Sequence, residues 1–573
     1  MESNSAWIII HRMRIPLLVI IITFAISILG MTLIPGRDDQ GNVYYMNFFD
    51  AFYFVSYMAT TIGFGEAPYT FTYPQRLWVS FCIYLTVIGW FYGIGNIIAL
   101  IQDKKLAREL AVARFRTKIK KLSEPFIIIL GYNNVTKEII RRLNSEGIRI
   151  VVVDKDESKI DEIELENFIP EVPAISGDTT KPEILKIAGI HEKNCQAVVV
   201  LFEDDIKNAK IALMCKLLNK KIDIIVKSTT KDNTEHLRNI GIRHIEDPFK
   251  IVSDRIYFQI TAPYIWLLEM WIFGHILRIR KREFLPKGKY IICGAGRMGK
   301  ALAHALERAN IEYVFIDIKS SDYKKRKQSA IYGDAEDIRI LMKAGIQDAS
   351  CIIAATKDDM INLTILSTAK KLNPSIYTIA RENTLEDISV FKSARIDQIY
   401  ILERVLAKYT YNFIARPMAN RFIRYIYHKD NNWAMHVVGK LSATIGKNPD
   451  VFEMTITEEN AYALYHELKK GMAINLEILR RSRTDYRKKN RIVFLMYHYE
   501  DEYTKETILM PDDNVEVKPG ASLLIACDEE SRIDFEYIIN NYYELYYVLT
   551  GKEQHMGVFN LLGRETTSIH NAA

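Results

Sequence analysis

The sequence predicts a helical membrane segment followed by two tandem, doubly wound α/β units and a small α+β lobe. Two long uncharged apolar stretches, Ile15–Ile34 and Leu77–Ile101, lie in the first hundred residues. Each is long enough to cross a hydrocarbon core of about 30 Å. From Phe126 onward, short β-branched runs alternate with amphipathic stretches, as in a parallel sheet covered by helices. This α/β pattern occurs twice, which indicates a duplicated module.

Composition narrows the class of protein. The 573 residues suffice for three or four domains. The 76 basic and 70 acidic residues leave a net charge of +6, and no basic stripe interleaved with aromatic residues points to nucleic acid as a partner. The six cysteines are scattered without a CxxC pair, so neither a disulfide framework nor a zinc site is indicated. We expect a reducing, cytoplasmic setting for most of the chain.

Basic residues flank the outer ends of both apolar stretches, in His11–Arg14 and in Asp103–Lys105. Positively charged flanks stay on the cytoplasmic side, so we expect a multi-pass protein of the cell membrane with both termini cytoplasmic. Between the spans, Asn47–Ala59 is apolar and aromatic but too short to cross the bilayer. Its length favours a re-entrant helix.

A loop with two glycines follows this short helix. Glycine allows successive carbonyls to face the same way, and four such loops form a K⁺ filter from the similar sequence Thr-Val-Gly-Tyr-Gly. The loop therefore resembles a K⁺ channel selectivity filter, whose residues here are Thr61, Ile62, Gly63, Phe64 and Gly65. A glycine turn in a soluble loop is the alternative, and the order span, half-helix, loop, span argues against it. Phe64 and Glu66 replace the usual tyrosine and aspartate, which leaves the strictness of selectivity open.

The second span contains several glycines. By resemblance to ligand-gated two-span channels, Gly93 lies at the gating hinge, while Asn96 and Ala99 line the intracellular entrance. Close helix packing is the alternative explanation for glycine in a membrane span.

The second α/β copy carries the fingerprint Gly294-Ala-Gly296-Arg-Met-Gly299 directly after a strand. Such glycines let a pyrophosphate approach the backbone and the helix N-terminus, and an acidic residue after the next strand binds ribose hydroxyls. The predicted nucleotide site comprises Gly294, Gly296, Arg297, Met298, Gly299, Asp317, Asp334, Thr356 and Arg381. Two alternatives are a glycine turn without a ligand and, for Arg381, a surface salt bridge.

The first copy retains only Gly131 of the fingerprint, together with Asp154. Asn133 and Thr136 would crowd a pyrophosphate, so we expect no standard dinucleotide there. A small ligand such as adenine at Gly131 and Asp154 stays open.

The repeats resemble RCK domains, the regulators of K⁺ conductance. The resemblance implies Rossmann lobes, a crossover helix pair after each lobe and a C-terminal lobe. The expected domains are a pore (1–103), a linker (104–124), the first lobe (125–247) with crossover helices but no C-terminal lobe (248–287), the second lobe (288–402), its crossover helices (403–430), its C-terminal lobe (431–550) and a flexible tail (551–573).

Some RCK channels bind Ca²⁺ through carboxylates at the ends of the fourth and fifth strands. Lys227 and Arg381 oppose a hard cation there, because Ca²⁺ prefers oxygen ligands. The remaining candidate ligands are Asp204, Asp205, Asp358 and Asp359.

These features predict a ligand-gated K⁺ channel and not an enzyme, with K⁺ as the permeant ion and NAD or ADP as the regulatory ligand. A filter built from four loops implies a homotetramer with a ring of eight RCK lobes. Two alternatives are a constitutive K⁺ pore with a structural ring and a membrane-anchored, NAD-dependent oxidoreductase. The second leaves the filter loop unexplained.

Overall fold

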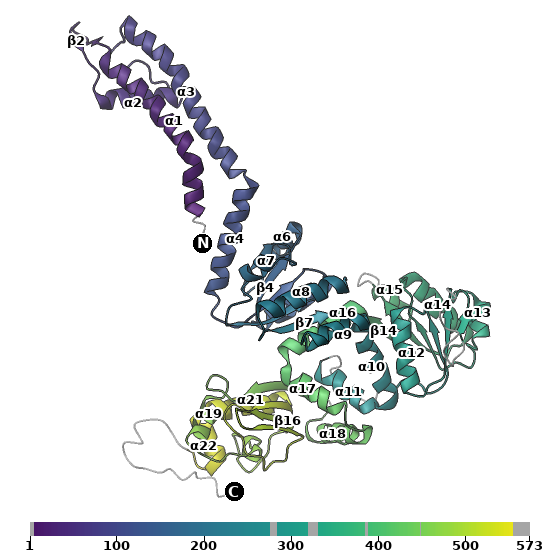
Figure 1. Cartoon of the computed structure of the whole chain (residues 1–573). Helices are drawn as coiled ribbons and strands as arrows, with labels where there is room; N and C mark the ends of the chain where they lie inside the picture. Colours follow the sequence, from purple (N-terminus) through teal and green to yellow (C-terminus); the bar gives the residue numbers. More distant parts are fainter. Residues whose placement is uncertain (1–4, 275–283, 319–329, 384–387, 447–448, 554–573) are drawn as a thin grey trace, which may run out of the picture. The chain divides into compact units, whose positions relative to one another are not determined.

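The computed structural model of the chain describes residues 5–274, 284–318, 330–383, 388–446 and 449–553 (Figure 1). Most of the predicted tail, residues 554–573, lies outside them. The chain forms two units, and each is described by itself. One holds residues 1–128 together with 151–167 and 171–195, and the other holds the rest.

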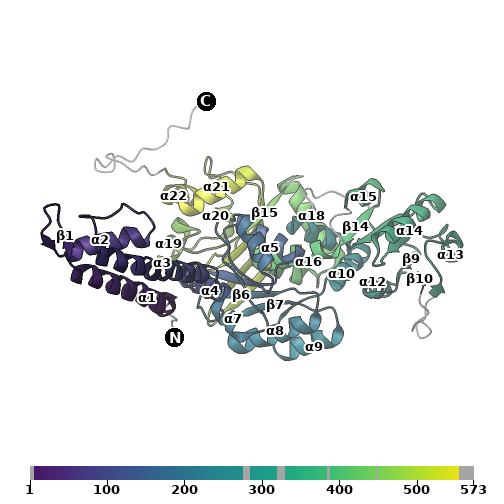
Figure 2. The same cartoon turned by 90° about the horizontal axis from the view of Figure 1, so that it is seen from above.

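The first unit begins with three helices, α1 (Ser5–Leu33), α2 (Phe48–Ala59) and α3 (Tyr73–Ile101). Helices α1 and α3 run side by side (Figures 1 and 2). A Cβ atom at Gly30 would lie 2.0 Å from the Trp78 ring, and one at Gly93 would lie 2.4 Å from Ile20 Cδ1. Glycines therefore allow the close approach of the two helices. A short hairpin, β1 (Gly36–Arg37) and β2 (Val43–Tyr44), lies between α1 and α2.

Both long helices are apolar enough to span a membrane over Met13–Leu33 and Tyr73–Ala99, and only 28% and 22% of the respective windows are buried. The core helix of a soluble protein would be mostly buried. Large apolar side chains stand exposed along both helices, as at Leu29 and Ile88. Surfaces of this kind require lipid or neighbouring subunits to cover them.

Two six-stranded sheets share one topology. Their orders are β5-β4-β3-β6-β7-β8 and β11-β10-β9-β12-β13-β14, which is the Rossmann order 3-2-1-4-5-6 in both. The first has β3 (Phe126–Leu130), β4 (Arg149–Asp154), β5 (Ala174–Ser176), β6 (Cys195–Val200), β7 (Asp223–Lys227) and β8 (His244–Glu246). The second has β9 (Tyr290–Cys293), β10 (Tyr313–Asp317), β11 (Ala330–Tyr332), β12 (Cys351–Ala354), β13 (Tyr377–Glu382) and β14 (Gln398–Ile401). The predicted duplication and fold class are confirmed.

Helices connect the strands, as the alternating pattern predicts. In the first lobe they are α5 (Asn134–Ser145), α6 (Glu157–Leu165), α7 (Pro182–Ile187), α8 (Asp205–Leu218) and α9 (Lys231–Asn239). In the second they are α12 (Arg297–Arg308), α13 (Ile338–Lys343), α14 (Asp359–Leu372) and α15 (Ile388–Ser393).

Each lobe is followed by a pair of crossover helices, α10 (Pro248–Thr261) with α11 (Pro263–Ile272) and α16 (Leu402–Ala415) with α17 (Pro417–Ile426). Proline cannot continue a helix but fits its first turn, so Pro263 and Pro417 separate each pair. The lobes exchange these helices: α10 packs on α12 of the second lobe, and α16 packs on α5 of the first. Tyr411 of α16 donates a hydrogen bond to Glu146 at the end of α5.

A buried ion pair lies among the crossover helices. Arg255 Nε contacts Glu269 Oε1 at 3.1 Å, with the two side chains 6% and 1% exposed. The Tyr427 hydroxyl donates to Glu269 Oε2 at 2.8 Å. Burial, and next to it the charge of Glu269, raise the pKa of Tyr427, so the hydroxyl keeps its proton as a donor. The three buried side chains thus provide polar partners for one another.

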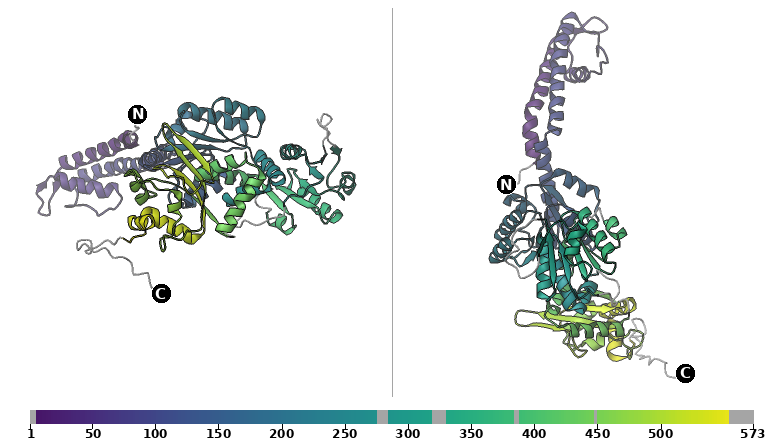
Figure 3. Two further views of the ribbon diagram at one scale, coloured as in Figure 1. Left: turned by 90° about the horizontal axis from the view of Figure 1, so that it is seen from below. Right: turned by 90° about the vertical axis from the view of Figure 1, so that its right-hand side faces the viewer.

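The C-terminal lobe has an antiparallel sheet, ordered β15-β18-β16-β17 and drawn in yellow-green in Figure 3. Its strands are β15 (Asp450–Thr455), β16 (Ile492–Glu500), β17 (Lys505–Leu509) and β18 (Ser522–Cys527). Its helices are α18 (Asn431–Thr444), α19 (Tyr462–Lys469), α20 (Leu476–Leu479), α21 (Glu529–Asn540) and α22 (Tyr542–Thr550). The predicted α+β lobe is confirmed.

Candidate functional sites: a filter loop and a nucleotide crevice

The filter loop follows α2 directly, and the short helix carries its own cap at Asn47, whose side chain accepts from Asp50 N. Thr61, Gly63 and Gly65 all have positive φ, a conformation that glycine adopts without a steric cost. In the single chain all five filter residues are exposed. Among the described side chains, only the Tyr57 hydroxyl donates a hydrogen bond to the loop, to Gly65 O at 2.6 Å.

Tyr57 supplies the hydroxyl that Phe64 lacks. Its ring meets that of Phe64 edge to face, with centroids 5.5 Å apart. Glu66, the other unusual residue, accepts from Phe71 N at 2.8 Å and pairs with Arg76 through two nitrogens, at 2.9 and 3.2 Å. The hydrogen bond from Arg76 holds the pKa of Glu66 below its usual range. Both departures from the usual filter sequence thus have partners outside the loop.

We expect Tyr57→Phe to shorten the conducting lifetime of the filter about two- to tenfold, because one hydrogen bond contributes roughly 0.5–1.5 kcal/mol. Single-channel recording at low K⁺ concentration measures this lifetime. Tyr53→Phe is the matched control, since Tyr53 lies one turn earlier on α2 and is 51% exposed. Equal lifetimes in the two variants would remove any role of the Tyr57 hydroxyl.

The three predicted gating residues lie along α3. Gly93 lies close to Ile20, so the packing of α1 against α3 by itself requires glycine there. This requirement does not depend on a hinge in α3. Asn96 Nδ2 donates to Tyr92 O at 2.7 Å, and Ala99 is exposed in the single chain. The pore-facing roles of Asn96 and Ala99 stay predictions.

The helix that continues from the pore is tied to the first lobe within the same unit. Helix α4 (Lys104–Lys121) buries Phe115 and Ile119. Lys118 Nζ pairs with Glu171 at 2.5 Å, and Asn194 Nδ2 donates to Leu122 O at 2.7 Å. These contacts give the linker a fixed attachment to that part of the lobe.

The predicted nucleotide crevice lies in the second lobe where β9 and β12 are neighbours, the point at which the strand order reverses. Ligands bind at such switch points, beyond the carboxyl ends of the strands. Gly294 follows β9 with φ +98°, and its added Cβ would lie 3.1 Å from Thr356 N. An added Cβ at Gly299 would lie 2.0 Å from Gly294 O. The fold itself therefore requires these two glycines.

Gly296 differs from the other two glycines. An added Cβ there meets nothing within 4 Å, so packing does not require glycine. Gly296 is also the N-cap of α12, and no side chain caps that end. The first amides of α12 thus have no side-chain cap, and an uncapped helix N-terminus is the arrangement that binds phosphate.

Two arginines stand at this crevice. The guanidinium groups of Arg297 and Arg381 lie 4.9 and 5.8 Å from the centroid of the same ring, Phe249 of α10. Arg381 Nε is buried without a hydrogen-bond partner in the described structure. Burial, followed by the charge of Arg297, lowers the pKa of Arg381. A surface salt bridge does not describe Arg381, and an anion between the two arginines would relieve both effects.

The other predicted site residues surround the glycine loop. Asp317 Oδ2 accepts from Ala295 N at 2.6 Å, which ties the carboxylate to the loop. Thr356 bonds Asn362 Oδ1 through its hydroxyl at 2.7 Å. Met298 is fully buried and packs instead of facing a ligand. Asp334 is exposed at the end of β11 and accepts from Glu336 N.

The first lobe contributes residues that the sequence did not identify. Arg297 Nη1 donates to Thr229 Oγ1 at 2.8 Å, and Thr229 donates to Asp205 Oδ2 from its amide at 2.7 Å. Phe249, which underlies both arginines, also belongs to the first copy. No local pattern marks Thr229 or Phe249, because their role depends on the exchanged crossover helix.

The equivalent loop of the first lobe is filled by its own side chains. Asn133 caps α5 by accepting from Thr136 N, and the Thr136 hydroxyl completes a capping box and donates to Gly131 O at 2.9 Å. An added Cβ at Gly131 would lie 2.5 Å from Phe202. Asp154, in the other unit, accepts from Asp156 N at 2.8 Å. The small-ligand site at Gly131 and Asp154 stays a prediction.

The candidate Ca²⁺ ligands already have partners. Asp204 and Asp358 cap α8 and α14. Asp205 accepts from Thr229, and Asp359 accepts from the Asn383 amide at 2.9 Å. Among the described residues, no group of three or more His, Cys, Asp or Glu side chains is placed to hold a metal ion.

Comparison with known proteins begins with the two α/β lobes. The TrkA-N domain family matches residues 127–248 and again residues 290–402. Two tandem segments of the chain thus match TrkA-N domains. These domains comprise the two Rossmann lobes described above, with the glycine crevice in the second.

Two relatives each match a little under half of the chain. Potassium channel protein 1 of Methanocaldococcus jannaschii is 28% identical over 240 residues, 42% of this chain and 67% of that protein. An uncharacterized protein of Methanothermus fervidus is 26% identical over 262 residues, 46% of this chain. The chain spans only 40% of that relative's length.

The GsuK channel structure aligns over 94% of this chain and all of that chain, with a TM-score of 0.50 and 17% identity. This likeness concerns the fold. A GsuK structure bound to NAD covers the same share at 16% identity with a TM-score of 0.49. The TrkA-N matches and the fold of the GsuK channel structure both agree with the tandem Rossmann lobes of this chain.

Proposed function

We propose that the protein is a ligand-gated K⁺ channel, a homotetramer with eight TrkA-N lobes whose second-lobe crevice binds an adenine nucleotide such as NAD or ADP. One observation carries the ligand proposal: the uncapped N-terminus of α12 opens at Gly296 beside the repelling pair Arg297 and Arg381. The first lobe supplies the contrast, because Asn133 caps its equivalent helix.

The residues present fit a nucleotide. The α12 amides and the two arginines would hold the phosphates through charge-assisted hydrogen bonds. Asp317 would accept from ribose hydroxyls. Because Arg297 also holds Thr229, phosphate binding would compete for the side chain that links the two lobes. Helix α4 would carry a change in the first lobe to α3, and both termini would lie on the cytoplasmic side.

A nucleotide shifts gating only by binding one state of the ring more tightly, and a change from 1:99 to 99:1 needs about 5.5 kcal/mol. In this proposal, K⁺ is the permeant ion. A regulatory Ca²⁺ has no support from the placement of the four aspartates. The potassium channel named among the relatives favours a channel over a nicotinamide-dependent enzyme.

The test is K⁺ current in planar bilayers while NAD, NADH, ADP, ATP and Ca²⁺ are titrated in turn. We expect a nucleotide to change the open probability, and Asp317→Asn to raise the half-effective concentration about tenfold. Asparagine still accepts from Ala295 N but replaces a charged hydrogen bond by a neutral one. A channel indifferent to every nucleotide would be a constitutive pore, and NADH turnover without K⁺ flux would indicate the enzyme.

A further inference from the structure

A cavity of about 550 Å³ lies among β7 and β8 of the first lobe, α17, and the β16–β17 pair of the C-terminal lobe. It shares no lining residue with the nucleotide crevice. Four cationic side chains line it, Arg243, Arg421, Arg424 and Lys505, against one carboxylate, Asp223. We call it the basic cavity.

The cations are largely uncompensated. Arg243 and Arg424 are exposed to the cavity side, and neither pairs with a carboxylate within the described ranges. Lys505 contacts Glu500 at 2.7 Å. Arg421 Nη1 is buried and has no hydrogen-bond partner among the described residues. A buried donor without an acceptor costs roughly 1–3 kcal/mol, so this guanidinium indicates a missing acceptor.

Three histidines also line the basic cavity: His244, His428 and His498. His498 is 6% exposed and contacts Thr507 Oγ1 at 2.8 Å and Glu500 at 3.2 Å. Burial first, and then Arg421, lowers the pKa of His498. The ring of His244 lies 4.1 Å from that of Phe413, and its pKa is lowered by burial, although Asp223 opposes this.

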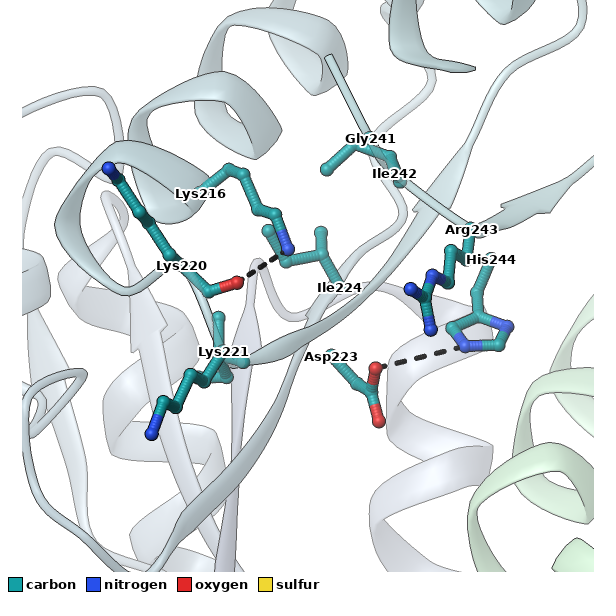
Figure 4. A pocket seen from close by; sticks show the side chains of 10 residues that line it. Lys216, Lys220, Lys221, Asp223, Ile224, Gly241, Ile242, Arg243 and His244 are labelled. Carbon is teal, nitrogen blue, oxygen red and sulfur yellow. Dashed lines mark hydrogen bonds and ion pairs between the residues drawn. The ribbon is translucent and has the colours of Figure 1, made fainter. Parts of the chain in front are cut away.

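The positive surface continues into a smaller cavity of about 240 Å³ (Figure 4). This cavity shares Asp223, Arg243 and His244 with the basic cavity and adds three lysines, Lys216, Lys220 and Lys221. Figure 4 shows Asp223 directed toward His244, 3.9 Å away. The one carboxylate of the basic cavity therefore faces a histidine of the same cavity.

We propose that the basic cavity binds a multiply charged phosphate anion of the pyrophosphate class, either free or as the phosphate tail of a nucleotide. Arginine forms bidentate hydrogen bonds with phosphate, and the volume lies within the range of small-molecule sites. The anion would join the first lobe, the second crossover pair and the C-terminal lobe, and so stabilise their arrangement by mass action. This site is independent of the proposed nucleotide crevice.

The test uses the full-length channel in detergent, carrying Gly296→Val so that the crevice does not contribute. Calorimetric titrations with inorganic pyrophosphate, ATP and adenosine distinguish a free phosphate anion from the phosphate tail of a nucleotide as the ligand. We expect pyrophosphate to bind and Arg421→Gln with Arg424→Gln to weaken it about 100-fold, since two charge-assisted bonds are lost. Arg424→Gln alone should weaken pyrophosphate binding about tenfold. Because the Arg424 side chain is exposed, misfolding would not explain this loss.

Matched controls are Arg339→Gln and Arg491→Gln, arginines 89% and 69% exposed away from the cavity. Tighter binding of ATP with the same arginine dependence would support the proposal with a nucleotide as the source. Absence of both pyrophosphate and ATP binding would overturn it. So would binding of adenosine as tight as that of ATP, or affinities unchanged by the cavity substitutions.

Discussion

Gly296→Val is expected to weaken nucleotide binding by the second lobe about 100-fold while the lobe stays folded. Gly296 has φ −69° and ψ −167°, a conformation that valine adopts readily. Beyond the two neighbouring residues, no atom lies within 4 Å of the added Cβ, so the substitution extends into the space proposed for the pyrophosphate. Loss of two charge-assisted hydrogen bonds at roughly 1.5 kcal/mol each gives the expected factor.

Calorimetry on the detergent-solubilised channel measures the affinity for NAD and ADP, and bilayer recording measures the gating response. Gly439→Val is the matched control, because an added Cβ at this α18 glycine also meets nothing within 4 Å. Gly299→Ala should instead disturb the loop itself, where the Cβ would overlap Gly294 O. Wild-type affinity in Gly296→Val would place the ligand elsewhere and remove the crevice from gating.

Glu269→Ala is expected to destabilise the lobes by about 3–5 kcal/mol, because it leaves the Arg255 guanidinium buried without its counter-charge. Tyr427 loses its acceptor at the same time. Urea unfolding followed by the fluorescence of Trp266 and Trp271, which are both buried residues of α11, reports the change.

Replacing Arg255, Glu269 and Tyr427 together tests whether the stranded charge causes the loss of stability. Arg255→Met, Glu269→Leu and Tyr427→Phe together should be close to neutral, since apolar residues of similar volume avoid the desolvation cost of the charges. Glu235→Ala, which breaks an exposed pair with Lys231, should cost no more than about 1 kcal/mol. A triple variant as unstable as Glu269→Ala would show that lost packing, and not the stranded charge, is responsible.

Local sequence patterns were sufficient to predict the helices and strands named here. The half-helix predicted over Asn47–Ala59 is present as α2 (Phe48–Ala59), and strands alternate with helices in both α/β copies as the repeated pattern predicts. Gly93 shows the limit of such reasoning. Its closeness to Ile20 depends on how α1 meets α3, and the sequence of α3 alone does not contain that contact.

The sequence by itself determined the order of two apolar helices with a half-helix and a glycine loop between them, the duplication of the Rossmann unit and the glycine fingerprint. These depend on neighbours within a few residues, so hydrophobic period and glycine spacing encode them. Tertiary structure alone decided that Tyr57 holds Gly65, that Thr229 reaches Arg297 across 68 residues and that Arg421 lines a cavity with Arg243. The first contact depends on how the loop after α2 folds back onto that helix. The other two bring together segments that are distant in the chain, and packing between distant segments leaves no periodic trace in the sequence.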